Sequence, residues 1–203
     1  MSFGCLLLTI WTMCCGSAAG QALVARDSFF VPHIFASTDA DAAYALGYCH
    51  AQDEFQKIQV LAVLVKRRAG ELAGVYGAPV DYYLELNDVR AVVRAALRDG
   101  DLSPQYLRVL EAYAAGINDF AQGRKWILPE LFPLCAEDLL TGYVTVLSFF
   151  MDLPGTLRAI RKGRIDEYRP NAGFGSNAYA LNAFRTTENA PFLAANPHVP
   201  LVG

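Results

Sequence analysis

The sequence predicts an α+β fold in which a mostly helical first part is followed by a charged connector and a β-hairpin. Three observations support this prediction. Apolar residues recur at helical spacing up to about residue 152, charged residues crowd residues 158–169, and two short β-like segments come after them. Helical periodicity and strand-like runs bounded by turn residues are the main sequence signals of these two element types.

Composition excludes several classes of protein. Of the 203 residues, 54% are hydrophobic and 18% are charged, against about 25% charged in a typical globular protein. So much apolar surface can offset the chain entropy lost on folding, which excludes general disorder. The formal net charge of −3 argues against binding to a nucleic acid, because such proteins usually carry a basic surplus. No apolar run reaches the roughly 18–20 residues that span a bilayer, so no membrane span is expected.

The first 20 residues resemble a secretory signal peptide in their order. An apolar segment over residues 5–15 is followed by small residues at 16–20, as in the hydrophobic and cleavage regions of signals. No Lys or Arg precedes the segment, because the first charged side chain is Arg26. A buried first strand or a misplaced start is the alternative. We expect cleavage between about Ala18 and Ala22 and a periplasmic or secreted protein.

Loss of this segment would leave two cysteines, Cys49 and Cys135. They could form one disulfide in an oxidising compartment or remain as two buried thiols. Neither has the spacing of a metal site.

Strand-like residues 23–36 come first in the predicted mature chain, and a long helix follows. Ser37-Thr38-Asp39 supplies N-cap oxygens, and Asp39 and Asp41 suit the positive end of the helix dipole. We expect this helix to run to Arg67 or Arg68, before glycines at 70, 74 and 77. Its predicted apolar face comprises Ala43, Leu46, Gly47, His50, Phe55, Ile58 and Leu61.

Two more helices are predicted. Ser103-Pro104 is a favourable N-cap and first-turn pair for a helix over 104–121. A strongly apolar helix is expected over 136–152, and Pro154-Gly155 should stop it.

The end of the chain predicts a hairpin, with strands at 177–181 and 191–195 around the polar residues 185–189. Residues 170–175 are too rich in proline and glycine for regular structure. A hairpin alone is marginally stable in water. Because the sequence supplies no further strands to pair with it, we expect the chain to be a truncated portion of a larger protein.

The junction of Gly175 and Ser176 is the most suggestive candidate for catalysis. A serine hydroxyl is a weak nucleophile unless a base lies beside it. Cleavage before Ser176 would create an α-amino group with a pKa near ~7.7–8 on the same residue as the hydroxyl. Glycine before the bond would allow a strained turn. A Gly-Ser pair alone is usually only a turn, so the dipeptide leaves both interpretations open.

The surrounding motifs resemble a known family. Residues 176–181 (SNAYAL) and 195–198 (ANPH) resemble the start of the β chain in the penicillin acylase family of N-terminal-nucleophile hydrolases, which includes cephalosporin, aculeacin and acyl-homoserine-lactone acylases. Segments similar to the family's α chain occur in the family's order at 26–27 (RD), 31–34 (VPHI), 43–48 (AYALGY), 51–53 (AQD), 70–73 (GELA) and 112–118 (AYAAGIN).

The resemblance implies an αββα hydrolase made as one precursor that is cleaved into α and β chains. It assigns 1–20 to the signal peptide, 21–157 to the α chain, 158–175 to a spacer and 176–203 to an incomplete β chain. Ser176 would be the nucleophile, its α-amino group the base, and His198 a group that orients the serine. The alternative for His198 is a hydrogen-bonded histidine at the end of a strand, with no part in catalysis. The family's oxyanion-hole donors lie beyond residue 203. The implied reaction is hydrolysis of a linear amide in a β-lactam, an acyl-homoserine lactone or a related N-acyl compound.

Other candidate residues have structural explanations. His33 is expected to serve a strand near the start of the mature chain. His50, Asp53 and Glu54 are expected to cap or to form salt bridges on a helix rather than to bind a metal. Tyr143, Phe149 and Phe150 could line an acyl pocket but are expected to pack in the core. No cofactor is implied, and no ligand can be placed for the calcium ion of penicillin G acylases.

A different class of function stays open at this stage. The chain could be a catalytically silent remnant that acts at most as a binding or interaction module. Truncation favours this alternative, whereas the presence of Ser176, Asn177 and His198 favours the enzyme. A serine protease or β-lactam-binding enzyme is disfavoured because neither G-x-S-x-G nor S-x-x-K occurs.

Overall fold

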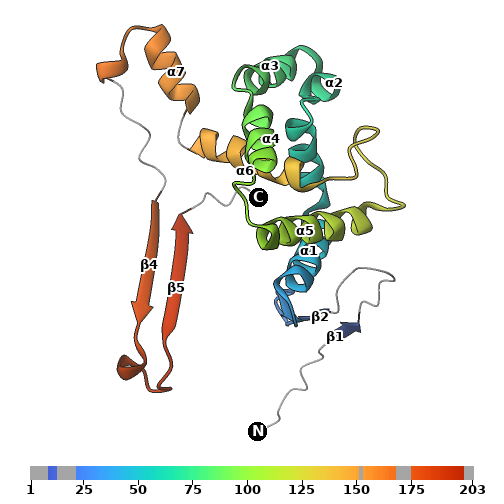
Figure 1. The fold of residues 1–203 in the computed structure, drawn as a ribbon, viewed down its shortest axis with the longest axis vertical. Helices are drawn as coiled ribbons and strands as arrows, with labels where there is room; N and C mark the ends of the chain where they lie inside the picture. The colour runs from blue at the N-terminus through green and yellow to red at the C-terminus, as the bar shows by residue number, and fades with distance from the viewer. Residues whose placement is uncertain (1–8, 13–21, 151–152, 168–174, 199–203) are drawn as a thin grey trace. The chain divides into compact units, whose positions relative to one another are not determined.

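The structure is a computed structural model that describes residues 9–12, 22–150, 153–167 and 175–198. The chain divides into two compact units, residues 1–145 and 146–203 (Figure 1), and each is described by itself. None of the helices in the described residues is both long enough and apolar enough to cross a membrane.

A small antiparallel sheet opens the first unit, with strands β1 (Thr9–Thr12), β2 (Ala22–Arg26) and β3 (Pro32–Ala36) in that order. Strand β1 lies inside the segment predicted to be a signal peptide, and export remains a prediction. The turn between β2 and β3 is organised by Asp27, whose carboxylate accepts hydrogen bonds from the backbone N–H groups of Phe29 and Val31 at 2.8 and 3.0 Å.

Helices α1 (Asp39–Val65) and α5 (Pro104–Ala121) form the centre of the unit. Both N-caps were predicted from sequence. Thr38 Oγ1 accepts from the Asp41 N–H and Ser103 Oγ from the Tyr106 N–H, each at 3.2 Å. The two helices contact each other so closely that a Cβ on Gly47 would lie 2.2 Å from the Tyr113 carbonyl oxygen, and one on Gly116 would lie 2.1 Å from that of Tyr44.

The predicted apolar face of α1 is only partly correct. Ala43 and Gly47 are buried, but Leu46, His50 and Leu61 are exposed. Glu54 has non-helical backbone angles (φ −134°, ψ 37°), so α1 is two helical segments joined at a kink. A single 3.6-residue period cannot keep its phase across such a break, which explains the error at Leu61. Leu46 and His50 precede the kink, in a segment whose buried residues are Ala43, Tyr44, Ala45, Gly47, Cys49 and Ala51.

Between α1 and α5 the chain is more helical than the sequence analysis predicted. It forms α2 (Ala69–Ala73), the short 3₁₀ helix η1 (Gly74–Tyr76), α3 (Ala78–Leu86) and α4 (Val89–Asp99). The glycines do break the chain into short pieces, as expected. Gly77 is required because a Cβ there would lie 1.9 Å from the Ala69 carbonyl oxygen.

The main core forms where α1 and α5 meet the segment that follows α5. Asn118 fixes this segment through both ends of its amide, donating to the Leu134 carbonyl at 2.8 Å and accepting from the Leu134 N–H at 2.7 Å. The buried core residues are Ala51, Ala62, Val63, Ala69, Ile117, Phe120, Ala121, Leu131, Phe132 and Leu134. Cys49 is buried and Cys135 is exposed, and both are free thiols, so neither the possible disulfide nor the expected burial of Cys135 is confirmed.

Helix α6 (Ala136–Phe150) follows the core segment and crosses the boundary between the units. The helix predicted over 136–152 is α6, which ends at Phe150, before Pro154-Gly155. A further helix that the sequence analysis did not predict, α7 (Leu153–Arg161), contains these two residues in its first turn. Proline is tolerated there because it occupies the first turn of a new helix, where its missing N–H has no partner to lose.

The predicted hairpin is present and longer than expected. Strands β4 (Gly175–Leu181) and β5 (Phe192–His198) pair antiparallel, with the 3₁₀ helix η3 (Ala183–Arg185) between them. A further 3₁₀ helix, η2 (Ile165–Glu167), follows α7.

Candidate active site

Ser176 is the second residue of β4 and lies directly opposite Pro197 of β5. Gly175 lies opposite His198, and Asn177 opposite Asn196. The sequence analysis predicted a hairpin of 177–181 and 191–195 but gave no register for its strands. The strand register brings their backbones together at the same end of the hairpin.

Pro197 determines how the backbone of Ser176 is bonded. Proline has no N–H and cannot donate a hydrogen bond across the ladder. Opposed residues in an antiparallel pair either exchange both backbone hydrogen bonds or exchange none, in alternation. Ser176 and Pro197 therefore form a non-hydrogen-bonded pair, and the N–H and C=O of Ser176 point away from β5. The nitrogen that cleavage would convert to an α-amino group is thus outside the β4–β5 ladder.

The register also separates Ser176 from residue 198. Successive strand positions alternate between the two faces of a sheet. Because position 198 lies opposite position 175, positions 176 and 198 are on opposite faces while the Gly175–Ser176 bond is intact. The side chain of His198 lies outside the described part of the structure, and the roles of Ser176 and His198 stay predictions.

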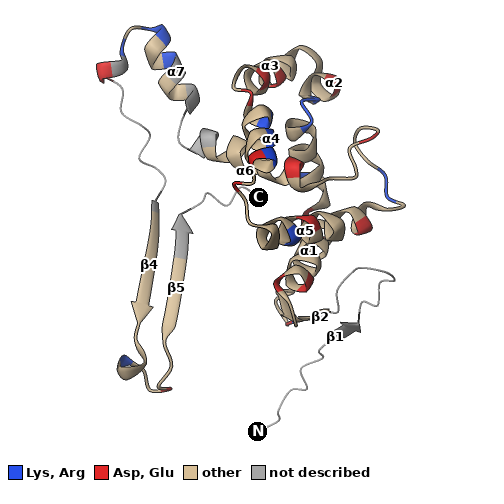
Figure 2. Cartoon of the chain, in the orientation of Figure 1, with Lys and Arg blue, Asp and Glu red and all other residues tan. Residues whose placement is uncertain are grey.

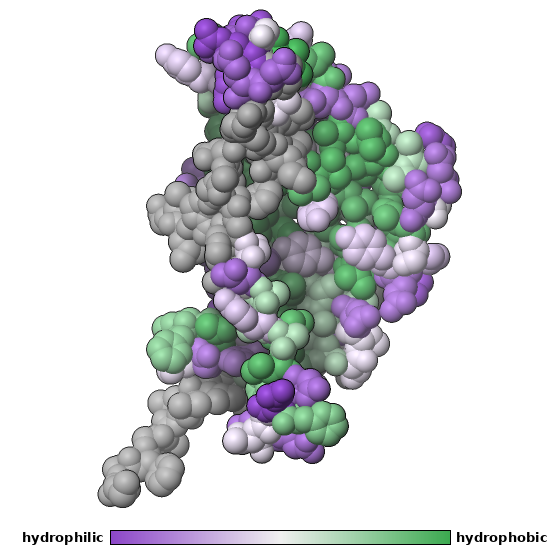
Figure 3. Space-filling view, turned by 90° about the vertical axis from the view of Figure 1, so that its left-hand side faces the viewer, coloured by the Kyte–Doolittle hydropathy of each residue, from purple (hydrophilic) through white to green (hydrophobic). Residues whose placement is uncertain are grey.

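The environment of Ser176 is open and uncharged. Ser176 itself is exposed, and neither β4 nor β5 contains Lys, Arg, Asp or Glu (Figure 2). Large apolar side chains of the hairpin are exposed as well, and Figure 3 shows further hydrophobic patches on the visible face of the molecule. The described part of the hairpin therefore leaves Ser176 exposed, with uncharged residues along both strands.

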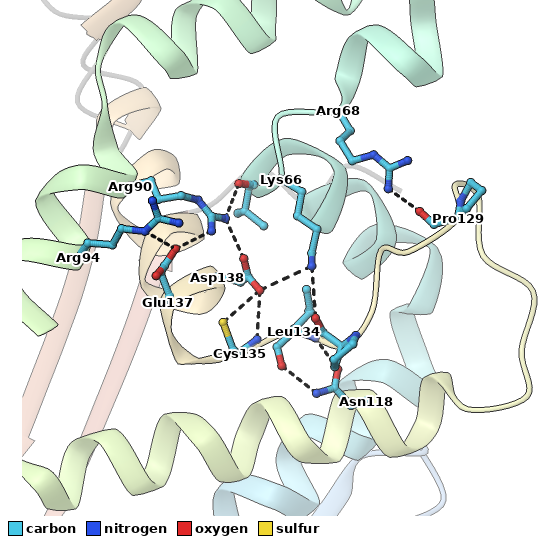
Figure 4. A network of polar contacts seen from close by, with 12 residues as sticks. Lys66, Arg68, Arg90, Arg94, Asn118, Pro129, Leu134, Cys135, Glu137 and Asp138 are labelled. Atoms are coloured by element: carbon cyan, nitrogen blue, oxygen red, sulfur yellow. Dashed lines mark hydrogen bonds and ion pairs between the residues drawn. The ribbon is translucent and has the colours of Figure 1, made fainter.

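The first unit contains a polar network that sequence reasoning missed (Figure 4). Arg90 of α4 lies 2.6 Å from Glu137 Oε1 and 2.8 Å from Asp138 Oδ1, both at the start of α6. The same guanidinium donates to the Val65 carbonyl at the end of α1, at 2.8 Å. Arg94 adds a second contact to Glu137 at 3.1 Å. The spacing of Arg90 and Arg94 on one helix face and the acidic first turn of α6 were the available signals.

This network borders a cleft of about 590 Å³ lined by Val65, Lys66, Arg67, Arg90, Pro133, Cys135, Glu137 and Asp138. The Cys135 thiol donates to Asp138 Oδ2 at 3.3 Å, and Lys66 Nζ donates to the Pro133 carbonyl at 3.3 Å. Lys66 also lies 3.9 Å from Asp138 Oδ2, whereas Arg67 pairs with Glu85 and Asp88, which do not line the cleft. The ion pairs of Arg90 and Lys66 thus join α1, α4 and α6.

The remaining candidates from the sequence have structural roles. His33 lies in β3, as expected, and its Nε2 is 3.1 Å from Asp27 Oδ2. His50 does not form the expected salt bridge but lies 2.6 Å from the Tyr113 hydroxyl through Nδ1. Burial raises the pKa of this Tyr113 hydroxyl.

The acidic residues near His50 do form salt bridges: Asp53 with Arg26 at 2.8 Å, and Glu54 with Lys57 at 3.0 Å. Within the described residues, no three or more His, Cys, Asp or Glu side chains are grouped so that they could hold a metal ion.

The proposed acyl-pocket residues all lie on α6. Tyr143 is 68% exposed, so it does not pack in the core of the first unit as expected. The side chains of Phe149 and Phe150 lie outside the described part of the structure.

Comparison with known proteins gives a family match over residues 21–203, to the penicillin amidase family. An acyl-homoserine lactone acylase, QuiP of Pseudomonas putida, is 32% identical over 102 residues, which are 50% of this chain and 12% of that protein. The penicillin acylase 2 proenzyme of Pseudomonas sp. (strain SE83) is 37% identical over 98 residues, 48% of this chain and 12% of that protein.

A third relative aligns over most of this chain. The acyl-homoserine lactone acylase PvdQ of Pseudomonas putida is 27% identical over 221 residues, covering 92% of this chain and 28% of that protein. This chain thus spans between about an eighth and just over a quarter of the length of these relatives.

Among solved structures, a thermostable penicillin G acylase from Alcaligenes faecalis matches with a TM-score of 0.55 and 20% identity, covering 73% of this chain and 87% of that chain. The structural match shows the fold and confirms the predicted α+β class.

Proposed function

The chain belongs to the penicillin amidase family, and on that premise we propose that it carries the nucleophile of an acylase that hydrolyses small N-acyl amides. One observation carries the proposal. Ser176 directly follows glycine near the start of β4, opposite the Asn-Pro-His segment, in a chain whose family match extends through both motifs. The relatives named acyl-homoserine lactone acylase and penicillin acylase act on N-acyl compounds, which gives the substrate class.

Activation would begin with cleavage of the Gly175–Ser176 bond. Ser176 Oγ attacks the Gly175 carbonyl carbon, the acyl group moves from nitrogen to oxygen, and water opens the resulting ester. The backbone at Ser176 has no hydrogen bond to β5 to break during this shift, because Pro197 is its partner. Glycine on the acyl side allows the strained turn that the attack requires.

The same two atoms would then serve substrate hydrolysis. The new α-amino group accepts the proton of Oγ as the oxygen attacks the substrate carbonyl, and the departing amine takes up a proton. Water opens the acyl-serine ester and regenerates the enzyme. Release of Ser176 from Gly175 frees its backbone to turn, so residue 198, one ladder step away, could come to orient the hydroxyl and the amine.

The proposal includes the processing expected from the sequence. Residues 1–20 would direct export to the periplasm or outside the cell and be removed. Residues 21–157 would form the α chain, 158–175 a spacer, and 176 onward the β chain. The structural match supports processing into separate chains in general terms, because it covers 73% of this chain and 87% of one chain of the solved acylase.

The decisive experiment uses a precursor that extends this chain to the length of its relatives. Ser176→Ala should abolish cleavage before residue 176 and lower amide hydrolysis at least about 10³-fold, because one oxygen serves both reactions. Ser176→Cys should retain cleavage better than turnover. Thr187→Ala, in the exposed hairpin turn, is the matched control and should change neither the cleavage before residue 176 nor the rate of amide hydrolysis.

Mass spectrometry of the purified protein and amine release from a chromogenic acyl amide measure the two reactions. A Ser176→Ala protein that is still cut before residue 176 and still hydrolyses the amide would overturn the assignment. His198→Ala should lower kcat while the protein is still processed and folded. Processing without amide hydrolysis in the unmodified precursor would favour the binding-module alternative.

A further inference from the structure

The β4–β5 hairpin (Figure 1) has two outer edges, and its register determines which backbone groups point to each edge. Because Ser176 and Pro197 form a non-hydrogen-bonded pair, every second pair along the ladder does the same. The outward-pointing N–H and C=O groups are those of positions 176, 178 and 180 on β4 and of positions 193, 195 and 197 on β5. In the described part of the chain, β4 and β5 pair only with each other, so each edge there is available to a further strand.

The two edges differ in their ability to pair with a strand. On β5, Pro197 has no N–H, so one of the outward positions lacks a donor. On β4, Ser176, Ala178 and Ala180 each offer both a donor and an acceptor. Proline at an outward position is a common protection of a sheet edge against pairing, and β5 has this protection whereas β4 does not. The favoured edge for a further strand is therefore that of β4.

The side chains of β4 do not oppose the approach of a second strand. Charged residues, especially Lys, usually protect exposed edges, but neither β4 nor β5 contains a charged side chain. Residues 176–181 are all exposed, and Tyr179 and Leu181 are 63% and 53% exposed. A two-stranded hairpin is marginally stable in water and is stabilised by additional strands. Charge and stability therefore both favour addition of a strand to β4.

The outward groups of β4 are complementary to those of a second copy of β4. They are placed symmetrically about Ala178, so an antiparallel second copy puts Ala178 opposite Ala178 and Ser176 opposite Ala180. Each of these opposed pairs can exchange both of its backbone hydrogen bonds. A shift of the second strand by two residues would lose one of the three pairs. Antiparallel pairing in this register has two-fold symmetry, which gives a closed dimer.

The side chains of β4 also fit this register. Positions 176, 178 and 180 share one face of the strand and carry only the small residues Ser and Ala. On the other face, Tyr179 lies opposite Asn177 of the second copy, and a cross-strand pair with an aromatic residue is stabilising. The register therefore brings no two large or like-charged side chains into opposition.

We propose that two copies of the 203-residue chain associate through the outer edges of their β4 strands and form one antiparallel sheet in the order β5-β4-β4-β5. The N–H and C=O groups of Ser176 then bond to Ala180 of the second copy. Pro197 leaves the two outer edges of this sheet without a full set of donors, so association stops at the dimer. The interface consists mainly of backbone atoms and is small, so we expect a dissociation constant of roughly 10–100 µM. Only backbone atoms of Ser176 take part, and the proposal does not rest on the proposed function.

Sedimentation equilibrium of the purified 203-residue chain, at concentrations from about 1 to about 300 µM, tests the dimer. The mass should rise from that of the 22.2 kDa monomer toward twice this value and no further. Ala178→Lys places like charges opposite each other at the two-fold axis and should raise the dissociation constant at least about tenfold. Ala195→Lys is the matched control, because residue 195 lies opposite residue 178 on the same face but belongs to β5. It should leave the dissociation constant unchanged.

A mixture of Ala178→Lys with Ala178→Glu tests both the register and the folding of the variants. Opposite charges then face each other, so mixed dimers should form at least as readily as those of the parent chain. Ser176→Ala, which removes the proposed nucleophile, should dimerise like the parent chain, so this association is tested separately from the enzyme chemistry. The proposal is overturned by a chain that stays at 22.2 kDa at the highest concentration, by association that Ala178→Lys does not weaken, by a Lys and Glu mixture that stays monomeric, or by growth beyond the dimer.

Discussion

The helical first unit and the hairpin of the second unit differ in how they use apolar side chains. The first unit buries Val63, Ile117 and Leu131 almost completely. In the hairpin, residues 176–181 and 192–195 are all exposed, although Tyr179, Leu181, Phe192 and Leu193 are large and apolar. Apolar composition alone therefore does not create a core, because a two-stranded ladder has nothing to cover its faces. Ser176, the proposed nucleophile, lies on a hairpin whose own side chains bury little apolar surface.

The largest expected effect is a difference in hydrogen exchange between these two regions. Amides in α1 and α5 should open only with the core, whereas those of β4 and β5 should open locally. We expect protection factors at least about 10³-fold higher in the two helices, equivalent to about 4 kcal/mol in opening free energy. Residue-resolved exchange of the 203-residue chain measures this difference. Uniform protection together with one cooperative melting transition would contradict it.

A second prediction concerns the close contact between α1 and α5. Gly116→Ala places a Cβ 2.1 Å from the Tyr44 carbonyl oxygen and 2.8 Å from the Tyr48 nitrogen, both rigid backbone atoms. The helices must move apart, at a cost of about 3 kcal/mol in the free energy of unfolding. Urea unfolding followed by far-UV circular dichroism measures this loss.

Gly142→Ala is the matched control, because its Cβ would meet only Val65 Cγ1, at 3.2 Å. The gain of about 1 kcal/mol in helix propensity should offset that contact. If both variants unfold at the same urea concentration, the glycine contact does not determine the spacing of α1 and α5.

The third effect is somewhat smaller and concerns the polar network. Arg90→Ala leaves the carboxylate of Asp138, whose side chain is 6% exposed, without its strongest partner. Because Arg90 is itself only partly buried, we expect a loss of about 2 kcal/mol, below the range for fully buried pairs. Arg98→Ala removes a pair whose side chains are 71% and 57% exposed and should cost less than about 0.5 kcal/mol. Urea unfolding measures both losses of unfolding free energy. Equal losses in the two variants would mean that the Arg90 network stabilises the fold no more than an exposed surface ion pair does.

Local chemistry made much of the fold predictable. Ser103 and Pro104 determine where α5 begins, because an N-cap oxygen and a first-turn proline act on their immediate neighbours. The hairpin was predictable for the same reason, since its strands and turn are close in sequence. The Gly175-Ser176 junction could likewise be identified as a candidate site from the dipeptide and the motifs around it.

Long-range contacts and a local break explain the errors. Arg90 and Glu137 are 47 positions apart, and nothing in either segment specifies the other. The kink at Glu54 affects only the second segment of α1, where Ala62 and Val63 are buried and Leu61 is exposed. The sequence analysis did not predict α3 and α4, because the glycines at 70, 74 and 77 indicated a break in helical structure and both helices are short. Opposite faces for positions 176 and 198 could be assigned only once the register was known.

The smallest effect expected is a change in pH dependence at the β2–β3 turn. The hydrogen bond from His33, together with those from the backbone N–H groups of Phe29 and Val31, holds the pKa of Asp27 below its usual value. A carboxyl with a lowered folded-state pKa stabilises the fold above its unfolded pKa of about 3.9, and this stabilisation disappears as the pH falls through the folded-state pKa.

Asp27→Asn should therefore be slightly less stable than the parent chain at pH 7, and the stabilities of the two proteins should converge below about pH 4. Urea midpoints measured from neutral to acid pH test this. The control is Asp101→Asn, an exposed carboxyl in the connection after α4, which should run parallel to the parent chain. A difference between Asp27→Asn and the parent that grows toward acid pH would reverse the sign of the argument and show that the turn is stabilised by the protonated carboxyl.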